Sequence, residues 1–537
     1  MYLILNTLWF IWMLKYVLFW LYLWQLKEYH LGRFVDHFRT HKGKKLLFSF
    51  EQIFKLVLLI FLLLLKDLFN FIFLVISIVY FAEFLIFVKN VFSRNFKKPV
   101  LTFKTIFLTA ISFTAVLIFL WWTTQINSTD QPAWLLGFDI FTSLIISVIV
   151  LFFQPFFVFV RNLKLNKAKE KLEQIRKLSG LKVVAITGSY GKTSTKEFLS
   201  TILSKKFKVL ATNKHQNSEI GVANCILNDL KPSHQVFIAE VGAYNKGKVK
   251  EVCNILKPKI GIVTGVNEQH LALFGSLENL LSAEGGGEMA QILEKENGLL
   301  IVNGDNKFCL DLLKKHNGKE KIYTENHKVI NADIWADEIS THKDFISFLA
   351  IDKAGEMAHF NVNVLGKQNV QNLLGAILVA KELGMNFGEI AEACKNIKQE
   401  QAGMILLEGK HGITIVDSSY SSNPSGVFAD LNYFSILSGK KVIVMPCLIE
   451  LGKKSGEIHE KIGRKIAEAC DFAIITSKDK FKSLKKGAME AGMKEKNIIL
   501  CDKSADIHAQ ITLFCKSGDS VLLEGRVPTG LLNLLKT

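Results

Sequence analysis

The stretch VVAITGSYGKTSTKEF, residues 183–198, contains the residue types that bind phosphate groups. A β-branched apolar run ends at a glycine, and a helix-prone run follows a lysine and a threonine. Glycines allow backbone N–H groups to close around phosphate oxygens, and the helix N-terminus adds the positive end of its dipole. We expect Lys192 to reach the β- and γ-phosphates of a nucleotide and Thr193 to ligate Mg²⁺.

The spacing of this loop differs from the common GxxxxGK[ST] pattern, because Gly188 lies three residues before Gly191. In the form TGSYGKTSTK, the loop resembles that of the Mur ligase family, whose members use ATP to join amino acids or peptides to a peptidoglycan precursor. Further segments resemble the family in the same order along the chain: AEVGAY, TGVNEQHLALFGSLENL and GKQNVQN. VDSSYSSNPSG and MPCLIELGKKSGEIHEKIG resemble its MurF branch, which adds D-alanyl-D-alanine.

The resemblance implies a set of site residues. In the family a substrate carboxylate attacks the γ-phosphate of ATP, an acyl phosphate forms, and an amine displaces the phosphate. Mg²⁺ and a lysine offset the charge of bringing two anions together. The implied catalytic residues are Lys192, His270 and Glu284, and the implied metal ligands are Thr193, Glu240, His270 and Glu284. The implied ATP-binding residues are Gly188, Ser189, Tyr190, Gly191, Lys192, Thr193, Ser194, Asn369, Asn372 and Asp417.

Three of these assignments compete with simpler ones. Taken alone, Glu240 reads as a solvated carboxylate at a strand end, and His270 as a surface loop histidine. Their order behind the phosphate loop favours metal binding. Glu284 stands where the family usually has a lysine, often carbamylated, that helps to hold a second metal ion. Glu284 supplies an encoded carboxylate there, and the alternative is a carboxylate that merely ends a helix.

Three other positions depart from the family. The usual pair of aspartates is Asp417 and Ser418, the histidine of the GxHN segment is Gln368, and the usual arginine is missing from QAGMILLEG. These changes leave open an altered geometry, or a ligase fold with weak or no catalysis.

Two α/β domains are expected to position these residues. From residue 181, apolar β-branched runs alternate with helical ones, which is typical of a mostly parallel sheet. Segment 322–365 alternates differently and predicts a small antiparallel insertion. We therefore expect a central ATP-binding domain over 181–401 and a Rossmann-like domain over 402–537. Ahead of them we expect an α-helical membrane domain over 1–160 and a cytoplasmic connector over 161–180.

The membrane domain is predicted from apolar runs of about 20 residues, the length that crosses hydrocarbon. Five candidate spans lie near 1–24, 47–65, 68–88, 105–122 and 135–160, and the second is the weakest because it contains Glu51 and Lys55. Lys15, Glu83 and Asp139 are further ionisable residues in the spans. We expect Glu83 and Asp139, near span ends, to reach polar surroundings.

Charge asymmetry predicts the orientation. The net charge is +17, and lysines and arginines crowd into loops 25–46 and 89–104, whereas loop 123–134 has none. Five spans with the N-terminus outside place the basic loops and both α/β domains in the cytoplasm of a multi-pass plasma-membrane protein.

The sequence has no basic stripe with interleaved aromatic residues, the pattern that would indicate nucleic-acid binding. Eight scattered cysteines, with no CxxC pair, fit a reducing compartment.

The leading hypothesis is a membrane-anchored ligase of peptidoglycan precursor synthesis and cell-wall biogenesis. Its expected partners are ATP, Mg²⁺, a UDP-linked muramyl peptide, an amino acid or dipeptide, and the lipid bilayer. The alternatives are a ligase for a lipid-linked precursor and a catalytically weak Mur-like scaffold. An ATP-driven transporter is disfavoured, because no LSGGQ-like segment follows the loop.

Overall fold

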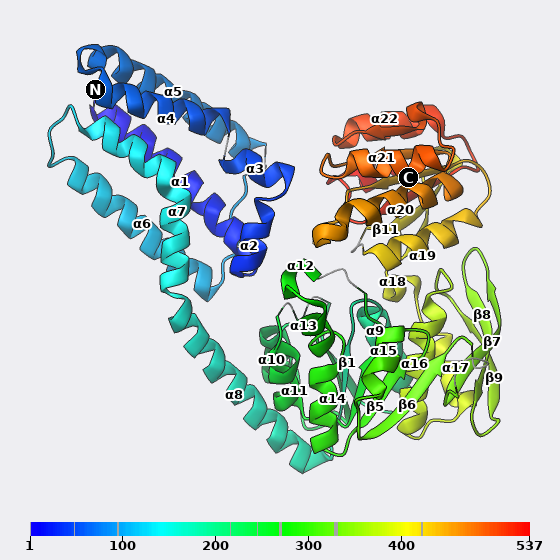
Figure 1. Ribbon diagram of the computed structural model, residues 1–537. Helices are drawn as coiled ribbons and strands as arrows, with labels where there is room; N and C mark the ends of the chain where they lie inside the picture. Colours follow the sequence, from blue (N-terminus) through cyan, green and yellow to red (C-terminus); the bar gives the residue numbers. More distant parts are fainter. Residues whose placement is uncertain are drawn as a thin grey trace. The chain divides into compact units, whose positions relative to one another are not determined.

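The computed structural model describes residues 2–47, 49–93, 96–214, 216–243, 245–267, 271–326, 331–419, 423–449 and 451–536. The chain divides into two compact units, Met1–Asn162 and Leu163–Thr537 (Figure 1). The first unit is helical, and the second contains two α/β sheets.

The first unit is built from apolar helices. They are α1 (Tyr2–Leu26), α2 (Leu31–His37), α3 (His41–Leu47), α4 (Phe50–Leu64), α5 (Phe69–Phe92), α6 (Phe103–Thr123) and α7 (Gln131–Phe152). Among the residues that the structure describes, five stretches are long and apolar enough to cross a membrane: 2–26, 43–64, 69–92, 103–123 and 131–152. The fifth ends before the predicted boundary at 160. Pro155 is the second residue of the next helix, where the missing N–H is tolerated, so the chain restarts a helix there.

Helix α1 forms the centre of this unit and packs against α5, α6 and α7. Its tryptophans are buried, and Trp24 stacks on Phe34 of α2 with ring centroids 3.9 Å apart. Many outward-facing side chains of α4 and α5 are instead exposed Phe, Leu, Ile and Val. Exposed apolar surface of this extent marks a face that meets lipid or another protein.

Helix α8 (Gln154–Ser179) carries the chain from the first unit into the second. Within the second unit, Leu165, Ala168, Leu172 and Ile175 are buried in its core. Their spacing of three and four residues forms one stripe on a helix. The predicted connector is therefore a helix that packs one of its faces against the second unit.

The second unit begins with a nine-stranded sheet in the order β2-β3-β1-β4-β5-β6-β7-β8-β9. Its strands are β1 (Lys182–Thr187), β2 (Val209–Ala211), β3 (Val236–Glu240), β4 (Ile260–Val263), β5 (Leu299–Asn303), β6 (Lys319–Thr324), β7 (Ile334–Thr341), β8 (Ile346–Asp352) and β9 (Met357–Val362). Its helices are α9 (Lys192–Leu203), α10 (Glu219–Asn228), α11 (Lys248–Leu256), α12 (Leu271–Phe274), α13 (Leu277–Ser282), α14 (Gly287–Lys295), α15 (Lys307–Leu313), α16 (Asn369–Glu382), α17 (Phe387–Cys394) and α18 (Gln399–Ala402).

Both faces of the central sheet are covered, which explains its continuous apolar strands. On β1, Val184 and Ile186 face a core shared with α9, α16 and α17. Val183 and Ala185 face the opposite core, shared with α8, α10, α11 and α14. Because strand side chains alternate between faces, a short apolar strand can serve two helical layers.

The predicted antiparallel segment exists, but it is not separate from the main sheet. β8 pairs antiparallel with both β7 and β9, and β7 pairs parallel with β6 through Tyr323 and Thr324 of β6 (Figure 1). The period-two pattern correctly indicated strands there. It carried no information about the edge at which they join.

The C-terminal domain has a six-stranded sheet in the order β10-β11-β15-β12-β13-β14. Its strands are β10 (Ile405–Glu408), β11 (Thr414–Ser418), β12 (Lys441–Met445), β13 (Phe472–Ile475), β14 (Ile498–Leu500) and β15 (Ser520–Glu524). Its helices are α19 (Pro424–Ser435), α20 (Ser455–Ala469), α21 (Phe481–Glu490), α22 (Ser504–Phe514) and α23 (Leu531–Leu535). The parallel pairing of β11, β15, β12, β13 and β14 agrees with the predicted Rossmann-like domain. β10, which pairs antiparallel with β11, was not predicted.

Candidate active site

The phosphate loop lies between the end of β1 and the start of α9. Gly188 and Gly191 have φ values of 139° and 77°, in the region that favours glycine. A Cβ atom on Gly191 would lie 2.4 Å from Asn372 Oδ1, so the close approach of α16 also requires glycine here. The ammonium of Lys192 donates to the carbonyl of Gly188, which holds its charge inside the loop.

Thr193 and Glu240, both predicted metal ligands, lie side by side. Thr193 Oγ1 donates to Glu240 Oε2 over 3.1 Å. Glu240 ends β3, which pairs in parallel with β1, so the carboxyl ends of the two strands bring the carboxylate to the loop. A carboxylate beside a threonine hydroxyl offers the oxygen ligands that Mg²⁺ prefers.

Two further residues hold Glu240 in place. Asn217 Nδ2 donates to Glu240 Oε1 over 3.0 Å, and Lys196 Nζ lies 3.6 Å from Oε2. Lys196 is fully buried, and its ammonium also donates to the carbonyl of Thr212 over 2.8 Å. These contacts fix the direction of the carboxylate that faces Thr193.

Neither Lys196 nor Asn217 was predicted as a functional residue. Lys196 had a usable signal, since it follows Thr193 by three residues on an expected helix, and such residues share a face. Asn217 lies in a loop after β2, and no local pattern connects it with Glu240.

Glu284 lies at the opposite end of the phosphate loop. Ser189 Oγ donates to Glu284 Oε2 over 3.3 Å, and Glu284 is 2% exposed. The carboxylate therefore reaches the loop itself. Its role as a metal-site residue stays a prediction.

His270 lies outside the described residues. Within the described part of the chain, no group of three His, Cys, Asp or Glu side chains is arranged to hold a metal ion. The contacts that are described, Thr193 with Glu240 and Ser189 with Glu284, place carboxylates at both ends of the loop.

The predicted asparagines lie against the loop. Asn372 Oδ1 accepts a hydrogen bond from Thr195 Oγ1 over 3.4 Å, and Asn372 Nδ2 donates to Asn369 Oδ1 over 3.1 Å. Both asparagines are buried at the start of α16. They support the loop, and a contact with the nucleotide base stays a prediction.

Tyr190 and Ser194 point away from the centre of the loop. The Tyr190 hydroxyl accepts from Asn306 Nδ2 over 3.2 Å, and its ring lies over Gly265, where a Cβ atom would clash with it. Burial raises the pKa of Tyr190. Ser194 Oγ donates to the carbonyl of Ala402 over 3.4 Å, which ties α9 to α18.

The C-terminal domain contributes a different arrangement. Asp417, at the end of β11, accepts from the backbone N–H of Ser419 over 3.1 Å and bonds to no other predicted site residue in the described ranges. Its neighbour Ser418 donates to Asp430. Gln368 of the central domain also donates to Asp430, over 3.4 Å. Gln368 and Ser418, two departures from the family pattern, therefore meet at one carboxylate.

Beside Asp430 lies Glu524, the last residue of β15, which is 1% exposed. Burial, together with the neighbouring Asp430 carboxyl, raises the pKa of Glu524 well above its ordinary range. Burial also raises the pKa of Asp430. The two carboxyls therefore form a buried acid pair at the carboxyl ends of β11 and β15.

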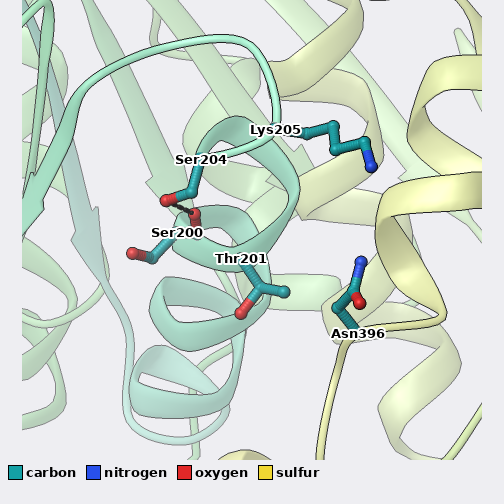
Figure 2. Close-up of a pocket in the computed structure, with 5 residues that line it drawn as sticks. All are labelled: Ser200, Thr201, Ser204, Lys205 and Asn396. Carbon is teal, nitrogen blue, oxygen red and sulfur yellow. Dashed lines mark hydrogen bonds between the residues drawn. The ribbon is translucent and has the colours of Figure 1, made fainter.

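A cavity of about 380 Å³ is lined by Ser200, Thr201, Ser204, Lys205 and Asn396 (Figure 2). Four of these residues lie at or just after the far end of α9, and Asn396 follows α17. Thr201 is roughly 12 Å along the helix axis from Thr193 at the usual rise per residue. The cavity is therefore separate from the phosphate loop.

The family model for the Mur ligase middle domain matches residues 186–380, and that for the Mur ligase glutamate ligase domain matches residues 404–527. Together they match more than half of the chain. The chain belongs to the Mur ligase family. The matched ranges contain the phosphate loop, Glu240, both asparagines and Asp417.

Among curated relatives, UDP-N-acetylmuramoyl-tripeptide–D-alanyl-D-alanine ligase of Borreliella burgdorferi is 30% identical over 286 residues, covering 53% of this chain and 59% of the relative. The enzyme of the same name from Escherichia coli is 28% identical over 293 residues, covering 54% of this chain and 63% of the relative. This Mur ligase thus spans about three-fifths of the relatives' length. Crystal structure I of MurF from Acinetobacter baumannii has a TM-score of 0.61 at 25% identity, covering 70% of this chain and 79% of that one.

Proposed function

We propose that the chain is a membrane-anchored, ATP-dependent ligase that adds D-alanyl-D-alanine to a muramyl tripeptide during peptidoglycan precursor synthesis. The observation that carries this proposal is the contact between Thr193 and Glu240 beside the Gly188–Thr193 loop. This pair supplies oxygen ligands at the point where the loop would hold the terminal phosphates. The MurF relatives motivate the choice of substrates.

The residues of the loop fit ATP and Mg²⁺. The two glycines leave backbone space that a side chain would fill, and Lys192 keeps its ammonium within the loop. Thr193 and Glu240 would hold the metal ion, with Glu284 at the other end of the loop. A bound Mg²⁺ supplies positive charge that offsets the repulsion between an anionic substrate and the phosphates. The role of the chain is to fix these groups in position before reaction.

The five apolar helices support a membrane location. We infer that the N-terminus lies outside and that residues 161–537 lie in the cytoplasm. The basic loops 25–46 and 89–104 favour this orientation. A single cysteine at Ser128, in a background without native cysteines, should react with an impermeant reagent added to intact cells. Labelling only after permeabilisation would show that this loop lies inside and that the orientation is the opposite one.

A second candidate shares the chemistry but changes the acceptor. The family models begin at residue 186, and the helical unit 1–162 precedes them. An enzyme held at the bilayer in this way can act on a lipid-linked muramyl peptide, whose carboxylate lies at the membrane surface. The UDP-linked and lipid-linked acceptors therefore need a direct comparison.

The test is phosphate release by the purified full-length protein. UDP-linked and lipid-linked muramyl tripeptides are each supplied with ATP and Mg²⁺, with and without D-alanyl-D-alanine. We expect phosphate release that requires both an acceptor and the dipeptide. The product should be heavier than the acceptor by the mass of D-alanyl-D-alanine less one water. No turnover with any acceptor, from protein that binds ATP, would favour the scaffold instead.

A further inference from the structure

The helical unit contains a fully buried lysine between two carboxylates. Lys55 Nζ, on α4, lies 2.8 Å from Glu83 Oε1 on α5 and 2.6 Å from Asp139 Oδ2 on α7. Lys55 and Asp139 are 0% exposed and Glu83 is 5% exposed. The expectation that Glu83 and Asp139 reach polar surroundings at span ends is therefore wrong. The ligase chemistry proposed above uses none of the three.

Asp139 is supplied with hydrogen-bond donors from three helices. Besides Lys55, Tyr80 Oη donates to Oδ2 over 2.9 Å, and Trp12 Nε1 donates to Oδ1 over 3.1 Å. The same two rings flank the lysine, whose Nζ lies 4.4 Å from the Trp12 centroid and 5.1 Å from the Tyr80 centroid. Donors directed at both oxygens favour the ionised form of a carboxylate.

Glu83 has a poorer environment for a charge. In the described part of the chain, Lys55 is the one group that donates to its carboxylate. That lysine is shared with Asp139, which it approaches more closely. Of the two carboxyls, Glu83 is therefore the one whose ionised form is less stabilised.

The charges of the cluster do not balance. Two carboxylates face one ammonium, and an excess charge is unfavourable in an apolar bundle. Lys15 of α1 and Glu51 of α4 act on this region with opposite signs. Lys15 is partly exposed over the Trp12 ring and forms no ion pair with Glu83 or Asp139 in the described structure. Neither outer charge forms an ion pair with a member of the buried trio in the described structure, so the excess charge stays at the trio.

We propose that Lys55, Glu83 and Asp139 form a proton-binding site within the helical unit, with the proton on Glu83. Lys55 and Asp139 are then an ion pair, and Glu83 is a neutral carboxylic acid. The bound proton removes the excess charge without a further side chain. The competing arrangement keeps both carboxylates ionised and uses Lys15 as the second cation.

Infrared spectroscopy of the full-length protein in lipid nanodiscs tests the site directly. A protonated acid has a carbonyl stretch that a carboxylate lacks, and the band shifts when the proton is exchanged for deuterium. We expect the wild-type spectrum minus that of Glu83→Gln to contain one such band at neutral pH. The acid pair at Asp430 and Glu524 contributes equally to both spectra and cancels.

Two variants separate the proposal from its competitor. Asp139→Asn removes one anion while Glu83 stays in place, so Lys55 and Glu83 balance and the acid band should disappear. Lys15→Gln should leave the band unchanged. A wild-type spectrum without the band, and its appearance in Lys15→Gln, would overturn the proposal in favour of the competing arrangement.

Folding defects in Glu83→Gln do not prevent a decision. Protein that keeps Glu83, carries ¹³C at its glutamate carboxyls and has the single change Glu524→Gln should show an isotope-shifted acid band that a further Asp139→Asn change abolishes. A band that does not shift with labelled glutamate would place the proton elsewhere and refute the assignment to Glu83.

Discussion

Two buried lysines, one in each unit, make similar contacts with carboxylates but have different roles. Lys196 lies 3.0 Å from Glu197 and 3.6 Å from Glu240, and Lys55 lies within 3.0 Å of both Glu83 and Asp139. Both lysines are fully buried. A buried charge requires a partner in either setting.

The two clusters differ in what else their carboxylates face. Glu240 is shared with Thr193 and lies at the carboxyl end of a parallel strand, beside a loop suited to phosphate. Asp139 faces Trp12 and Tyr80, which belong to the same helical bundle. The first cluster therefore prepares a carboxylate for a ligand, and the second is closed by its own helices.

The largest expected effect comes from removing the lysine of the closed cluster. Lys55→Met leaves two carboxyls without their cation, and breaking a buried ion pair costs about 3–5 kcal/mol of folding stability. We expect a lower thermal unfolding temperature in detergent. Lys44→Met, at an exposed position of α3, serves as the matched control. Equal unfolding temperatures for the two variants would show that the cluster contributes little to stability.

At the phosphate loop, Lys192→Ala should remove nearly all ATP turnover while membrane insertion is kept. Loss of one group that stabilises transferring charge typically costs roughly 3–4 kcal/mol, or 10²–10³-fold in rate. Phosphate release by wild type and variant in the same nanodiscs measures the effect. Turnover at the wild-type rate would remove the nucleotide assignment.

Lys196→Met tests whether the buried lysine of this site positions Glu240. Removal of residues that orient metal ligands commonly lowers metal affinity or activity by about 10–100-fold. We expect turnover to require more Mg²⁺ while the KM for the acceptor changes little. Lys205→Met, at an exposed position after α9, is the control. An unchanged magnesium titration would assign Lys196 a purely structural role.

Glu284→Gln asks whether the carboxylate beside Ser189 takes part in the metal site. An amide of the same size is a weaker partner for a hard cation, so we expect about a tenfold higher magnesium requirement. Glu278→Gln, exposed on α13, should behave as wild type. Glu284→Lys should regain activity only with bicarbonate, if a carbamylated lysine can replace the glutamate. Overlapping magnesium curves for Glu284→Gln and Glu278→Gln would leave Glu284 as a helix-end carboxylate.

The sequence predicted what local patterns encode. The β1–loop–α9 unit follows from a β-branched run, glycines and a helix start within 16 residues of chain, and the strand series follows from apolar alternation. Contacts between distant segments were not available from such patterns. Asn217 reaches Glu240 from 23 residues away, and Lys55 reaches Asp139 from 84 residues away.

The same limit explains why Lys55 counts against the second span when only the sequence is considered. A lysine in an apolar run argues against a span only while its partners are unknown. Once Glu83 and Asp139 are placed beside it, the lysine becomes part of the interior of the bundle. Hydropathy predicted the helices correctly here, but it carried no information that their charged residues would meet inside the bundle.

A third buried carboxyl site, Glu524 with Asp430, extends the comparison because no lysine is bonded to either carboxyl in the described structure. The pKa of Glu524 is raised by burial and by Asp430, so the folded state holds a proton that the unfolded state releases. An unfolded glutamate has a pKa of about 4.3. The contribution of this group to the free energy of unfolding is therefore complete at pH values below that pKa. It is lost as the pH rises through the folded-state pKa, by at most about 1.4 kcal/mol per pH unit for one group.

Glu524→Gln should flatten this dependence, since an amide keeps the size and a donor but has no proton to lose. Thermal unfolding of the full-length protein between acidic and alkaline pH, compared with Glu408→Gln at an exposed position of β10, measures the slope. We expect the wild type and Glu408→Gln to lose stability more steeply with rising pH than Glu524→Gln. Because Asp430 shares the site, Asp430→Asn should also flatten the curve, by relieving the repulsion that raises the pKa of Glu524. Parallel curves for all four proteins would mean that a cation outside the described contacts neutralises the pair, and the distinction between sites with and without a lysine would then fail.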